Sequence, residues 1–422
     1  MLIQFKVGNY RSFCGQQTIA MTADASKEHF ETHTAESGIN NLGRLLRSAA
    51  IYGPNAAGKT NLLKALQFMQ QVVVTSATSA PTTKLPHDPF RLSSVTKSQS
   101  TDFEIAIIKD GVRYEYGFSL GPQRVENEFL LEYPHGRGRR LFERTWNGKD
   151  EEYEWNFSTH FTGNKSLWRD ATRDNALFLS MAVQLNNQQL KPVFEWFQKR
   201  LVVIVGNMSM NAGLTLKLFE SQRGKDHLLS FIREADSGIS DVEIQREPLS
   251  SGPGYMIGAG APIIEQGPAN SPPNLVRVSF SHLATDTRER VKFDLSDESN
   301  GTQALFKNAG AWLNVFANGE VLLFDEIDTS LHPLLTRFLI AQFHSDATNP
   351  NGAQLVFSTH DTTLLNQELF RRDQIWFVEK QTDASTRLYP LSEFSPRNDE
   401  AIERWYMRGR YGALPILSQT RH

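Results

Sequence analysis

The chain has 422 residues, 40% hydrophobic and 22% charged, with a formal net charge of -3 and one cysteine, Cys14. This length allows two or three domains, or one domain with a large insertion, and the charge gives no indication of a nucleic-acid or anionic-membrane partner. A single cysteine excludes an internal disulfide, no apolar run is long enough for a membrane span, and the first residues turn polar too early for a signal peptide, so we expect a cytoplasmic protein.

Near the start of the chain, residues 2–7 alternate like a β-strand, and the polar turn Asn9-Tyr-Arg-Ser-Phe13 follows with two aromatic anchors. Further on, Gly53-Pro-Asn-Ala-Ala-Gly-Lys-Thr60 fits the phosphate-binding pattern G-x-x-x-x-G-K-[ST] at every fixed position. The apolar stretch before it is typical of a buried strand, and the residues after it have helical spacing. A strand, a glycine loop and a helix start together predict an anion site made of backbone N–H groups.

Each residue type in this loop has an expected role toward ATP. We expect Lys59 to bridge the β- and γ-phosphates as a point charge, and the Thr60 hydroxyl to bind Mg²⁺. The alternative is a glycine turn that happens to precede a helix. The residues expected to bind the nucleotide here are Gly53, Asn55, Ala56, Ala57, Gly58, Lys59, Thr60 and Asn61.

Between Asp102 and Phe157, apolar residues recur with period two. This pattern predicts antiparallel strands at residues 103–108, 114–118 and 128–132, with a hairpin turn at Lys109-Asp-Gly-Val112. We expect this β-rich block to belong beside the nucleotide loop rather than to a separate module.

The remaining organisation follows from changes in pattern along the chain. Residues 165–236 are mainly helical in pattern, apart from a strand-like stretch at 201–205, and residues 248–273 contain eleven Gly and Pro residues that stop any regular element. From Asn274 to Glu379, strands and helices alternate, as in a parallel sheet layered with helices. We therefore expect an α/β fold with three parts, which are a β-rich first lobe at 1–160, a mainly helical insertion at 161–273 and a second lobe at 274–422.

A second half of the site is predicted by Glu320-Val-Leu-Leu-Phe-Asp-Glu326, an apolar run that ends in two carboxylates. This pattern is typical of a buried parallel strand whose end places acidic residues at the carboxyl edge of the sheet. We expect this strand to be adjacent to the strand that precedes the phosphate loop. Asp325 is expected to hold the Mg²⁺ shell and Glu326, pointing the other way, to act as general base on a water. The alternative is a strand that ends in a solvated acidic turn.

Two further stretches qualify as parts of the site. The apolar strand Gln354-Leu-Val-Phe-Ser-Thr-His360 ends in a histidine that could hydrogen-bond the γ-phosphate, the alternative being a histidine at a helix start capped by Asp361 or Thr359. Ser299-Asn-Gly301 opens a helix and could hold a phosphate, although Ser-Asn-Gly is also a common cap and turn.

The order of these motifs resembles that of ABC-type ATPase heads, which have a phosphate loop, a signature motif, a Walker B strand with a catalytic Glu, a D-loop and an H-loop. The turn at residues 9–13 resembles the N-terminal segment of SMC-like and RecF-like heads, and this implies that Asn9, Arg11 and Ser12 contact nucleotide. The resemblance also implies a homodimer or higher homo-oligomer, in which two heads enclose ATP and Ser299 and Gly301 of one subunit face the γ-phosphate of the other. The signature here is Ser-Asn-Gly where that family has Ser-Gly-Gly.

A narrower resemblance covers nearly the whole chain. Besides the motifs above, Asn175-Ala-Leu-Phe-Leu-Ser180 and the tail at residues 406–415 are similar to single-chain AAA family ATPases of bacterial anti-phage defence systems, of the RloA and AbiL type, related to the ATPase half of OLD proteins. This implies a Mg²⁺-dependent ATPase that regulates a separate effector protein. OLD proteins append a Toprim nuclease that needs an Asp-x-Asp pair, whereas this chain has no such pair and only 62 residues after His360.

Other functions and weaker signals stay open beside this hypothesis. The rival is a RecF-like or SMC-like DNA-binding repair ATPase, although residues 160–290 contain too few heptads for a long coiled coil. The basic run at 135–140 could touch a nucleic-acid backbone or form a solvated hairpin tip. The tail arginines Arg404, Arg408 and Arg410 could pair with carboxylates of a partner or of this chain. We predict no structural metal.

Overall fold

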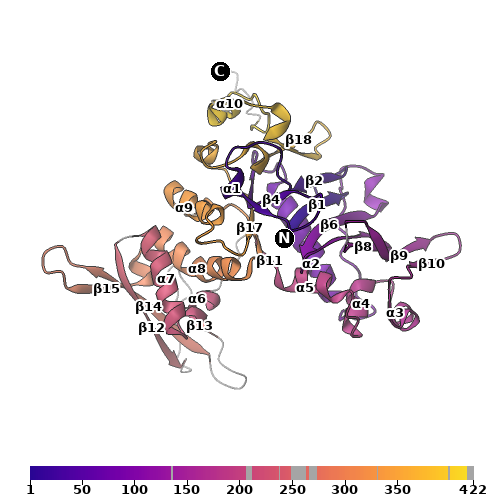
Figure 1. The fold of residues 1–422 in the computed structure, drawn as a ribbon, viewed down its shortest axis with the longest axis horizontal. Coiled ribbons are helices and arrows are strands. Elements are labelled where there is room, and N and C mark those ends of the chain that lie inside the picture. The colour runs from indigo at the N-terminus through magenta and orange to yellow at the C-terminus, as the bar shows by residue number, and fades with distance from the viewer. Residues whose placement is uncertain are drawn as a thin grey trace. The chain divides into compact units, whose positions relative to one another are not determined.

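The computed structural model describes residues 1–134, 136–205, 212–236, 238–248, 263–265, 273–329, 331–397 and 400–415. His135 and most of the Gly/Pro-rich stretch predicted at 248–273 lie outside these residues. The chain forms two compact units (Figure 1). The first unit consists of Met1–Gly206, Asn318–Ile327 and Ile340–His422, and the second of Asn207–Ala317 and Asp328–Leu339.

A six-stranded sheet forms the centre of the first unit, in the order β11-β16-β17-β5-β18-β19. Its strands are β5 (Ser48–Tyr52), β11 (Leu201–Ile204), β16 (Val321–Phe324), β17 (Gln354–Ser358), β18 (Ile375–Lys380) and β19 (Thr386–Pro390). All neighbouring strands pair in parallel except β18 and β19. Every residue of β5, β16 and β17 is buried, as expected for parallel strands covered on both faces. The predicted parallel α/β sheet is confirmed.

The order of these strands differs from the prediction at one point. Strand β17 lies between β5 and β16, so the strand with the paired acids is not adjacent to the strand of the phosphate loop. The pairing of Ser358 with Ile51 and of Phe357 with Phe324 shows that the three strands end at one level. The segments that follow them therefore meet at one edge of the sheet.

A second, antiparallel sheet of the first unit has seven strands in the order β10-β9-β8-β7-β6-β1-β2. The strands are β1 (Leu2–Gly8), β2 (Gln17–Ala20), β6 (Thr101–Lys109), β7 (Val112–Leu120), β8 (Val125–Tyr133), β9 (Arg139–Asn147) and β10 (Glu152–Phe157). The predicted strands correspond to β6, β7 and β8. Asp110 and Gly111 form the expected hairpin turn with φ of 52° and 75°.

Helix α2 (Lys59–Thr75) shares one hydrophobic core with both sheets. Its apolar side chains include Leu62, Leu66 and Met69, all nearly inaccessible to solvent. Helices α4 (Phe178–Gln184) and α5 (Lys191–Lys199) pack on α2, and α3 (Lys165–Ala171) packs on α4.

These contacts place residues 165–205 in the first unit. The Gln70 side-chain amide of α2 donates to the carbonyl oxygens of Phe197 and Leu201 at 2.7 and 2.8 Å, and Ser180 Oγ donates to the carbonyl oxygen of Val73 at 2.6 Å. We expected this segment at the start of the insertion, which was predicted to begin at residue 161. The helices expected in this segment are present, and the domain boundary at residue 161 stays a prediction.

A buried ion pair explains the stretch at residues 175–180. Glu128 and Arg144 are both fully buried and lie 2.9 Å apart. Glu128 also accepts hydrogen bonds from Tyr116 Oη at 3.0 Å and from the backbone N–H groups of Phe178 and Leu179 at 2.7 and 2.9 Å. These bonds satisfy donors at the start of α4 that would otherwise lack partners. The stretch therefore has a structural role in this fold.

The rest of the first unit consists of short elements around the six-stranded sheet. They are α1 (Phe30–His33), β3 (Thr34–Glu36), β4 (Arg44–Leu46), α10 (Ile402–Met407) and the 3-10 turns η1 (Thr96–Ser98), η3 (Thr362–Leu364), η4 (Arg372–Gln374) and η5 (Leu391–Phe394). Tyr406 and Tyr411 stack on Phe377 of β18, with ring centroids 5.3 and 5.9 Å apart. The tail aromatics therefore pack on the chain's own sheet, while Arg404 and Arg408 are exposed.

The second unit combines helices with a small antiparallel sheet. Its elements are α6 (Gly213–Leu218), α7 (Gln222–Ala235), β12 (Ile239–Pro248), β13 (Ile263–Glu265), β14 (Asn274–Leu283), β15 (Arg290–Asp294), η2 (Leu295–Asp297), most of α8 (Asn300–Asn318) and the start of α9 (Pro333–His344). Strand β14 pairs with β12, β13 and β15. Strand β12 was not predicted in the mainly helical insertion. From Asn274 onward, strands were expected in a parallel sheet, whereas β14 pairs antiparallel with its neighbours.

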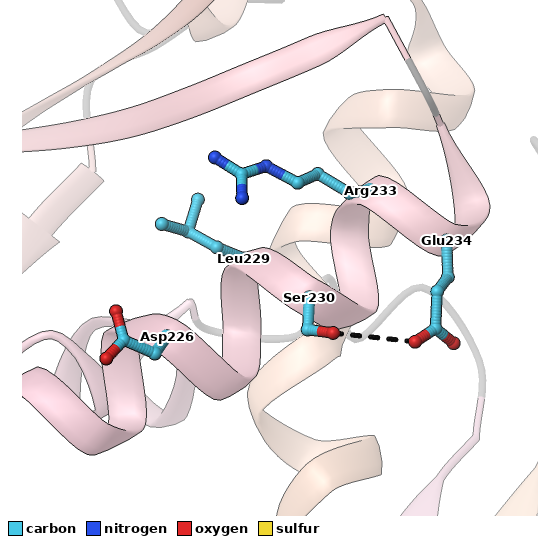
Figure 2. Close-up of a pocket in the computed structure, with 5 residues that line it drawn as sticks. All are labelled: Asp226, Leu229, Ser230, Arg233 and Glu234. Carbon is cyan, nitrogen blue, oxygen red and sulfur yellow. Dashed lines mark hydrogen bonds between the residues drawn. The ribbon is translucent and has the colours of Figure 1, made fainter.

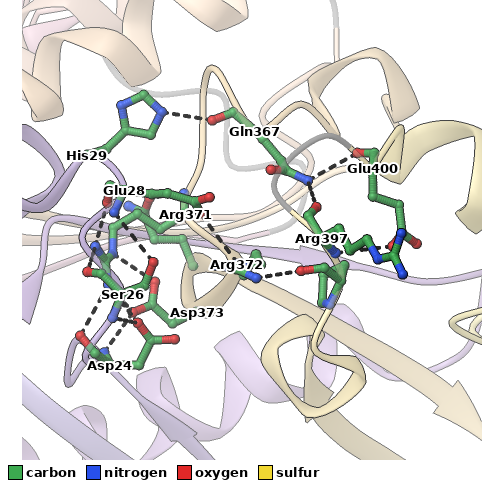
Figure 3. A network of polar contacts seen from close by, with 12 residues as sticks. Asp24, Ser26, Glu28, His29, Gln367, Arg371, Arg372, Asp373, Arg397 and Glu400 are labelled. Carbon is green, nitrogen blue, oxygen red and sulfur yellow. Dashed lines mark hydrogen bonds and ion pairs between the residues drawn. The ribbon is translucent and has the colours of Figure 1, made fainter.

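Arg371 ties the N-terminal part of the chain to the edge of β18 (Figure 3). Its fully buried guanidinium binds the carboxylates of Asp24 and Asp373 at 2.9 and 2.7 Å. It also donates to the carbonyl oxygens of Ser26 and Glu28 at 2.9 and 2.5 Å. Since the charge is paired and its donors are bonded, this burial is compatible with a stable fold.

Among the residues that the structure describes, no helix is long and apolar enough to cross a membrane.

Two buried histidines stack beneath strand β5. The rings of His33 and His344 lie 3.7 Å apart, and His344 Nε2 is 2.9 Å from Ser48 Oγ at the start of β5. Burial lowers the pKa of His33 from 6.5 to about 4, and burial also lowers the pKa of His344 well below its usual value. The folded protein therefore holds both rings neutral at neutral pH.

This stack predicts a pH dependence of stability. The unfolded chain protonates these histidines near pH 6.5, whereas the lowered pKa values delay protonation in the folded protein, to about pH 4 for His33 and to well below pH 6.5 for His344. The unfolded state therefore binds more protons in this acidic range. The free energy of unfolding should therefore fall as the pH drops from about 6.5 toward 4. Urea unfolding of wild type and His344→Asn at several pH values checks this, with the exposed His160→Gln as control. The prediction fails if His344→Asn shows the same decline with acidity as wild type.

Candidate nucleotide site

The loop between β5 and α2 is shaped by its two fixed glycines. A Cβ atom on Gly53 would lie 2.2 Å from the carbonyl oxygen of Val378, and one on Gly58 would lie 2.5 Å from Thr386 Oγ1. Gly58 also has a φ of 116°, which side chains disfavour. Both positions therefore need glycine for the loop to close against β18 and β19. The loop then leads into the first turn of α2, where helix N–H groups and the helix dipole favour anions.

Lys59 lies inside this loop and is 5% exposed. Its ammonium donates to the carbonyl oxygens of Gly53 and Pro54 at 2.8 and 3.2 Å. The chain thus holds a positive charge at the centre of the backbone cradle, where a phosphate needs a counter-charge. Ala57 and Gly58 are buried, while Asn55 and Ala56 are exposed at the rim of the loop.

Asp325, which directly follows strand β16, links this strand to the phosphate loop. Its Oδ1 atom accepts hydrogen bonds from Thr60 Oγ1 at 3.2 Å and from Ser358 Oγ at 2.6 Å. Thr60 is the second residue of α2, and Ser358 is the last residue of β17. Thr60 and Asp325, the two residues predicted to bind Mg²⁺, are therefore hydrogen-bonded to each other, although they are 265 residues apart in sequence.

Glu326 follows Asp325 but is not part of strand β16, which ends at Phe324. Its φ is 52°, in the left-handed region, and its side chain is exposed. The strand alternation that we used to direct Glu326 away from Asp325 therefore does not apply, because a turn sets the direction. The exposed Glu326 carboxylate has access to solvent water, as a general base requires. It is the residue next to Asp325, which is hydrogen-bonded to Thr60.

Ser12 and Thr386 hold the phosphate loop from outside. Asn61 Nδ2 donates to Ser12 Oγ at 2.9 Å, Thr386 N–H donates to the Ser12 carbonyl oxygen at 2.7 Å, and Thr386 Oγ1 donates to the Ala57 carbonyl oxygen at 2.7 Å. The turn at residues 9–13 thus contacts the loop and the helix start, while the contact of Ser12 and Asn61 with a nucleotide stays a prediction. Thr386 was not predicted, since a lone threonine in a strand carries no signal in the sequence.

Asn9 and Arg11 have other partners in the structure. The Asn9 side-chain amide donates to the carbonyl oxygens of Thr96 and Ser100 at 2.9 and 3.0 Å, and its oxygen accepts the Phe90 N–H at 3.0 Å. Arg11 Nε binds Asp88 Oδ2 at 2.8 Å. Both residues thus organise the segment 88–100, and their contact with a nucleotide stays a prediction.

His360 lies two residues after the end of β17 and is exposed. The N–H of the preceding Thr359 donates to the carbonyl oxygen of Ile51 at 3.2 Å, which places this segment beside the start of the phosphate loop. Asp361 caps η3 by accepting the Thr363 N–H at 2.9 Å. The capping alternative and the position near the loop are both present, so the role of His360 toward a γ-phosphate stays a prediction.

The signature residues lie in the second unit. Ser299 Oγ accepts the Thr302 N–H at 3.1 Å at the start of α8, and Gly301 lies in the first turn of this helix. The exposed Ser299 thus marks a helix N-terminus, as predicted. The role of Ser299 and Gly301 toward phosphate stays a prediction.

A hollow of about 310 Å³ lies along α7 in the second unit (Figure 2). Its lining residues are Asp226, Leu229, Ser230, Arg233 and Glu234. All five come from one helix, and Ser230 Oγ donates to Glu234 Oε1 at 3.5 Å. Because, among the described residues, no polar group from another element lines this hollow, it lacks the converging groups of a ligand site.

The residues at the phosphate loop suit ATP with Mg²⁺. Mg²⁺ prefers hard oxygen ligands and usually takes one or two carboxylates together with phosphate oxygens and waters. The Thr60 hydroxyl and the Asp325 carboxylate supply such oxygens side by side. The glycine loop and Lys59 supply the donors and the charge for phosphates.

Comparison with known proteins adds a family match. Residues 48–366 match the protein family described as "AAA domain, putative AbiEii toxin, Type IV TA system". This range covers more than half of the chain and extends from the first residue of β5 past β17 and His360. No curated protein matches the chain.

Two solved structures are similar to the chain at low sequence identity. The SMC head domain from Thermotoga maritima has a TM-score of 0.41 and 13% identity, over 92% of this chain and 98% of that chain. The Smc head domain from Pyrococcus furiosus, with an extended coiled coil and bound to the C-terminal domain of ScpA, has a TM-score of 0.40 and 11% identity, over 93% of this chain and 97% of that chain.

The contact of Thr386 with the loop predicts a measurable effect on ligand binding. Thr386→Val keeps the shape of the side chain but removes the hydrogen bond to the Ala57 carbonyl oxygen, so the loop should be held less firmly. We expect ATP affinity to fall by roughly 3- to 10-fold, in line with about 1 kcal/mol for such a bond. Calorimetric titration measures this, and Thr145→Val, which alters an exposed strand threonine of β9, is the control. Equal ATP affinities for Thr386→Val and wild type would contradict the assignment.

Proposed function

The chain belongs to the AAA-domain family that matches residues 48–366, and on this premise we propose that it binds ATP at the loop Gly53–Thr60 and hydrolyses it with Mg²⁺. The observation that carries the proposal is the bond between Thr60 Oγ1 and Asp325 Oδ1. It joins the hydroxyl that ends the phosphate-loop motif to the carboxylate that follows the acidic strand. In P-loop ATPases these two groups hold the metal.

The roles of the residues follow from their chemistry. Lys59 binds phosphate oxygens as a buried cation, and Thr60 and Asp325 hold the Mg²⁺, which neutralises charge on the phosphates when bound. Glu326 takes the proton from the attacking water. His360, two residues beyond the end of β17, donates a hydrogen bond to the γ-phosphate.

Two variants separate binding from hydrolysis. Lys59→Ala should abolish ATP binding, because it removes the charged contact to the phosphates. Glu326→Gln should keep binding and slow hydrolysis by about 100-fold or more, since an amide cannot accept the proton. Calorimetry and phosphate release measure the two effects. If Glu326→Gln hydrolyses ATP at the wild-type rate, the base assignment is wrong.

We further propose that two heads close around ATP as a homodimer, with Ser299 and Gly301 of one subunit at the γ-phosphate of the other. The support is that Ser299 is exposed at the first turn of a 19-residue helix, where an anion is favoured. Ligand that binds only the closed pair stabilises it by linkage, by about 2.7 kcal/mol at a hundredfold excess over the Kd.

Glu326→Gln with ATP and Mg²⁺ should therefore accumulate a dimer, because slow hydrolysis preserves the closing ligand. Sedimentation or sizing with and without ATP measures the association state. Ser299→Arg in the same background should prevent the shift, since it places a bulky cation at the contact. An association state that does not respond to ATP would count against closure.

We propose that this ATPase controls a separate effector in a cytoplasmic anti-phage defence complex, of the RloA and AbiL type. The support is the family description, which refers to a putative toxin and a type IV toxin–antitoxin system, together with the lack of an Asp-x-Asp pair in the sequence. Arg404 on α10 and Arg408, which directly follows this helix, are exposed and available for a partner's carboxylates.

The purified chain should accordingly leave plasmid DNA, tRNA and total RNA intact in the presence of ATP with Mg²⁺ or Mn²⁺. Gel electrophoresis of each nucleic acid measures this, with Lys59→Ala treated in parallel as control. Cleavage that survives stringent purification and disappears with a point mutation in this chain would contradict the proposal. ATP-dependent gel shifts of linear duplex DNA would instead favour the RecF-like or SMC-like alternative.

A further inference from the structure

Ser358 is the last residue of strand β17 and is fully buried. Its hydroxyl donates to Asp325 Oδ1 at 2.6 Å and accepts the Glu326 N–H at 2.8 Å. Its carbonyl oxygen accepts the Ile327 N–H at 3.1 Å. One residue of the strand between the phosphate loop and the acids thus contacts three successive residues beyond β16.

These bonds stabilise an unusual backbone turn. Glu326 has a φ of 52°, a conformation that residues with a side chain rarely adopt outside turns and functional sites. Ser358 binds the N–H groups of Glu326 and of the next residue, Ile327, which is itself fully buried. The direction of the Glu326 carboxylate is therefore set by this turn and by the serine that fixes it.

The same hydroxyl also restrains Asp325. Thr60 and Ser358 donate to one carboxylate oxygen from two sides, at 3.2 and 2.6 Å. The shorter bond comes from Ser358, so the carboxylate is held mainly by β17 rather than by the phosphate loop. A hydroxyl is the side-chain group that can donate to a carboxylate and accept from an N–H through one atom.

We propose that Ser358 is a positioning residue for ATP hydrolysis. It holds the turn that directs the Glu326 carboxylate toward the water, and it orients the Asp325 carboxylate toward Thr60. This inference rests on the proposed function, since it assigns Ser358 a part in the same site. It predicts that the serine acts on turnover through Glu326 and on metal-dependent binding through Asp325.

At saturating Mg²⁺, removal of the hydroxyl should lower turnover with little change in ATP binding. We expect Ser358→Ala to reduce kcat by about 10- to 100-fold, the effect of a slightly misplaced catalytic group, while the KM for ATP changes little. Ser358→Thr restores the hydroxyl and should recover most of kcat. Ser180→Ala is the matched control, because it removes another buried serine hydroxyl, bonded to the Val73 carbonyl oxygen and remote from the acids in sequence.

Two further readouts separate positioning from a general loss of stability. In the Glu326→Gln background and at saturating Mg²⁺, where the effect through Asp325 is masked, Ser358→Ala should cause no additional loss of kcat, because the base through which it acts is already absent. In a titration of a fluorescent ATP analogue, Ser358→Ala should need several-fold more Mg²⁺ for half-maximal binding, and Ser180→Ala should behave as wild type. If Ser358→Ala does not fold, Ser358→Cys, which has a weaker hydrogen-bonding group of similar size, is judged by the same criteria.

Wild-type kcat in Ser358→Ala would overturn the inference. So would an equal fractional loss of kcat in the Glu326→Gln background, or a Ser358→Thr variant as slow as Ser358→Ala. Different results would contradict the proposed function itself. These are a wild-type protein that does not hydrolyse ATP, or a Glu326→Gln variant that hydrolyses ATP as fast as wild type. An active wild type, a slow Glu326→Gln and a fully active Ser358→Ala would refute the role of Ser358 alone.

Discussion

The geometry of the candidate nucleotide site depends on one carboxylate oxygen that accepts hydrogen bonds from two hydroxyls. Asp325 Oδ1 accepts from Thr60 at the start of α2 and from Ser358 at the end of β17. Three segments that leave the sheet after β5, β17 and β16 are thereby joined at one edge. Hydrogen bonds to a charged acceptor are stronger than those between neutral groups, so this small cluster defines the geometry that a nucleotide and its metal would meet.

Packing behind this cluster explains why its geometry is well defined. Helix α2 begins at Lys59 and shares one core with both sheets of the first unit. A helix held on two sides cannot shift without opening close-packed contacts. The loop itself closes against β18 and β19, where Gly53 and Gly58 leave no space for a side chain. The glycines, the helix start and the acids therefore form a preorganised set, which lowers the cost of binding a charged ligand.

Much of this site could be predicted because each part is encoded over a few adjacent residues. The phosphate loop has a fixed spacing, and the apolar run before Asp325 and Glu326 is sufficient to indicate a buried strand with acids at its end. The β6–β7 hairpin could be predicted for the same reason, since Asp110-Gly111 is a local turn signal.

The remaining features depend on contacts between distant residues. Thr386 binds the carbonyl oxygen of Ala57 across 329 residues, and a strand threonine gives no indication of such a partner. The insertion of β17 between β5 and β16 is a matter of strand order, which local patterns do not specify. The left-handed turn at Glu326 likewise depends on Ser358, so the strand alternation from which we predicted the direction of this side chain does not apply there.

The most direct test of the account is a crystal structure of Glu326→Gln with ATP and Mg²⁺. The account predicts triphosphate density in the loop Gly53–Thr60, with Lys59 at the β- and γ-phosphates and the metal beside Thr60 and Asp325. It also predicts that Ser358 keeps its bond to Asp325 in this state. Triphosphate bound elsewhere, or a metal held without Thr60 and Asp325, would contradict the central claim that these residues form one nucleotide site.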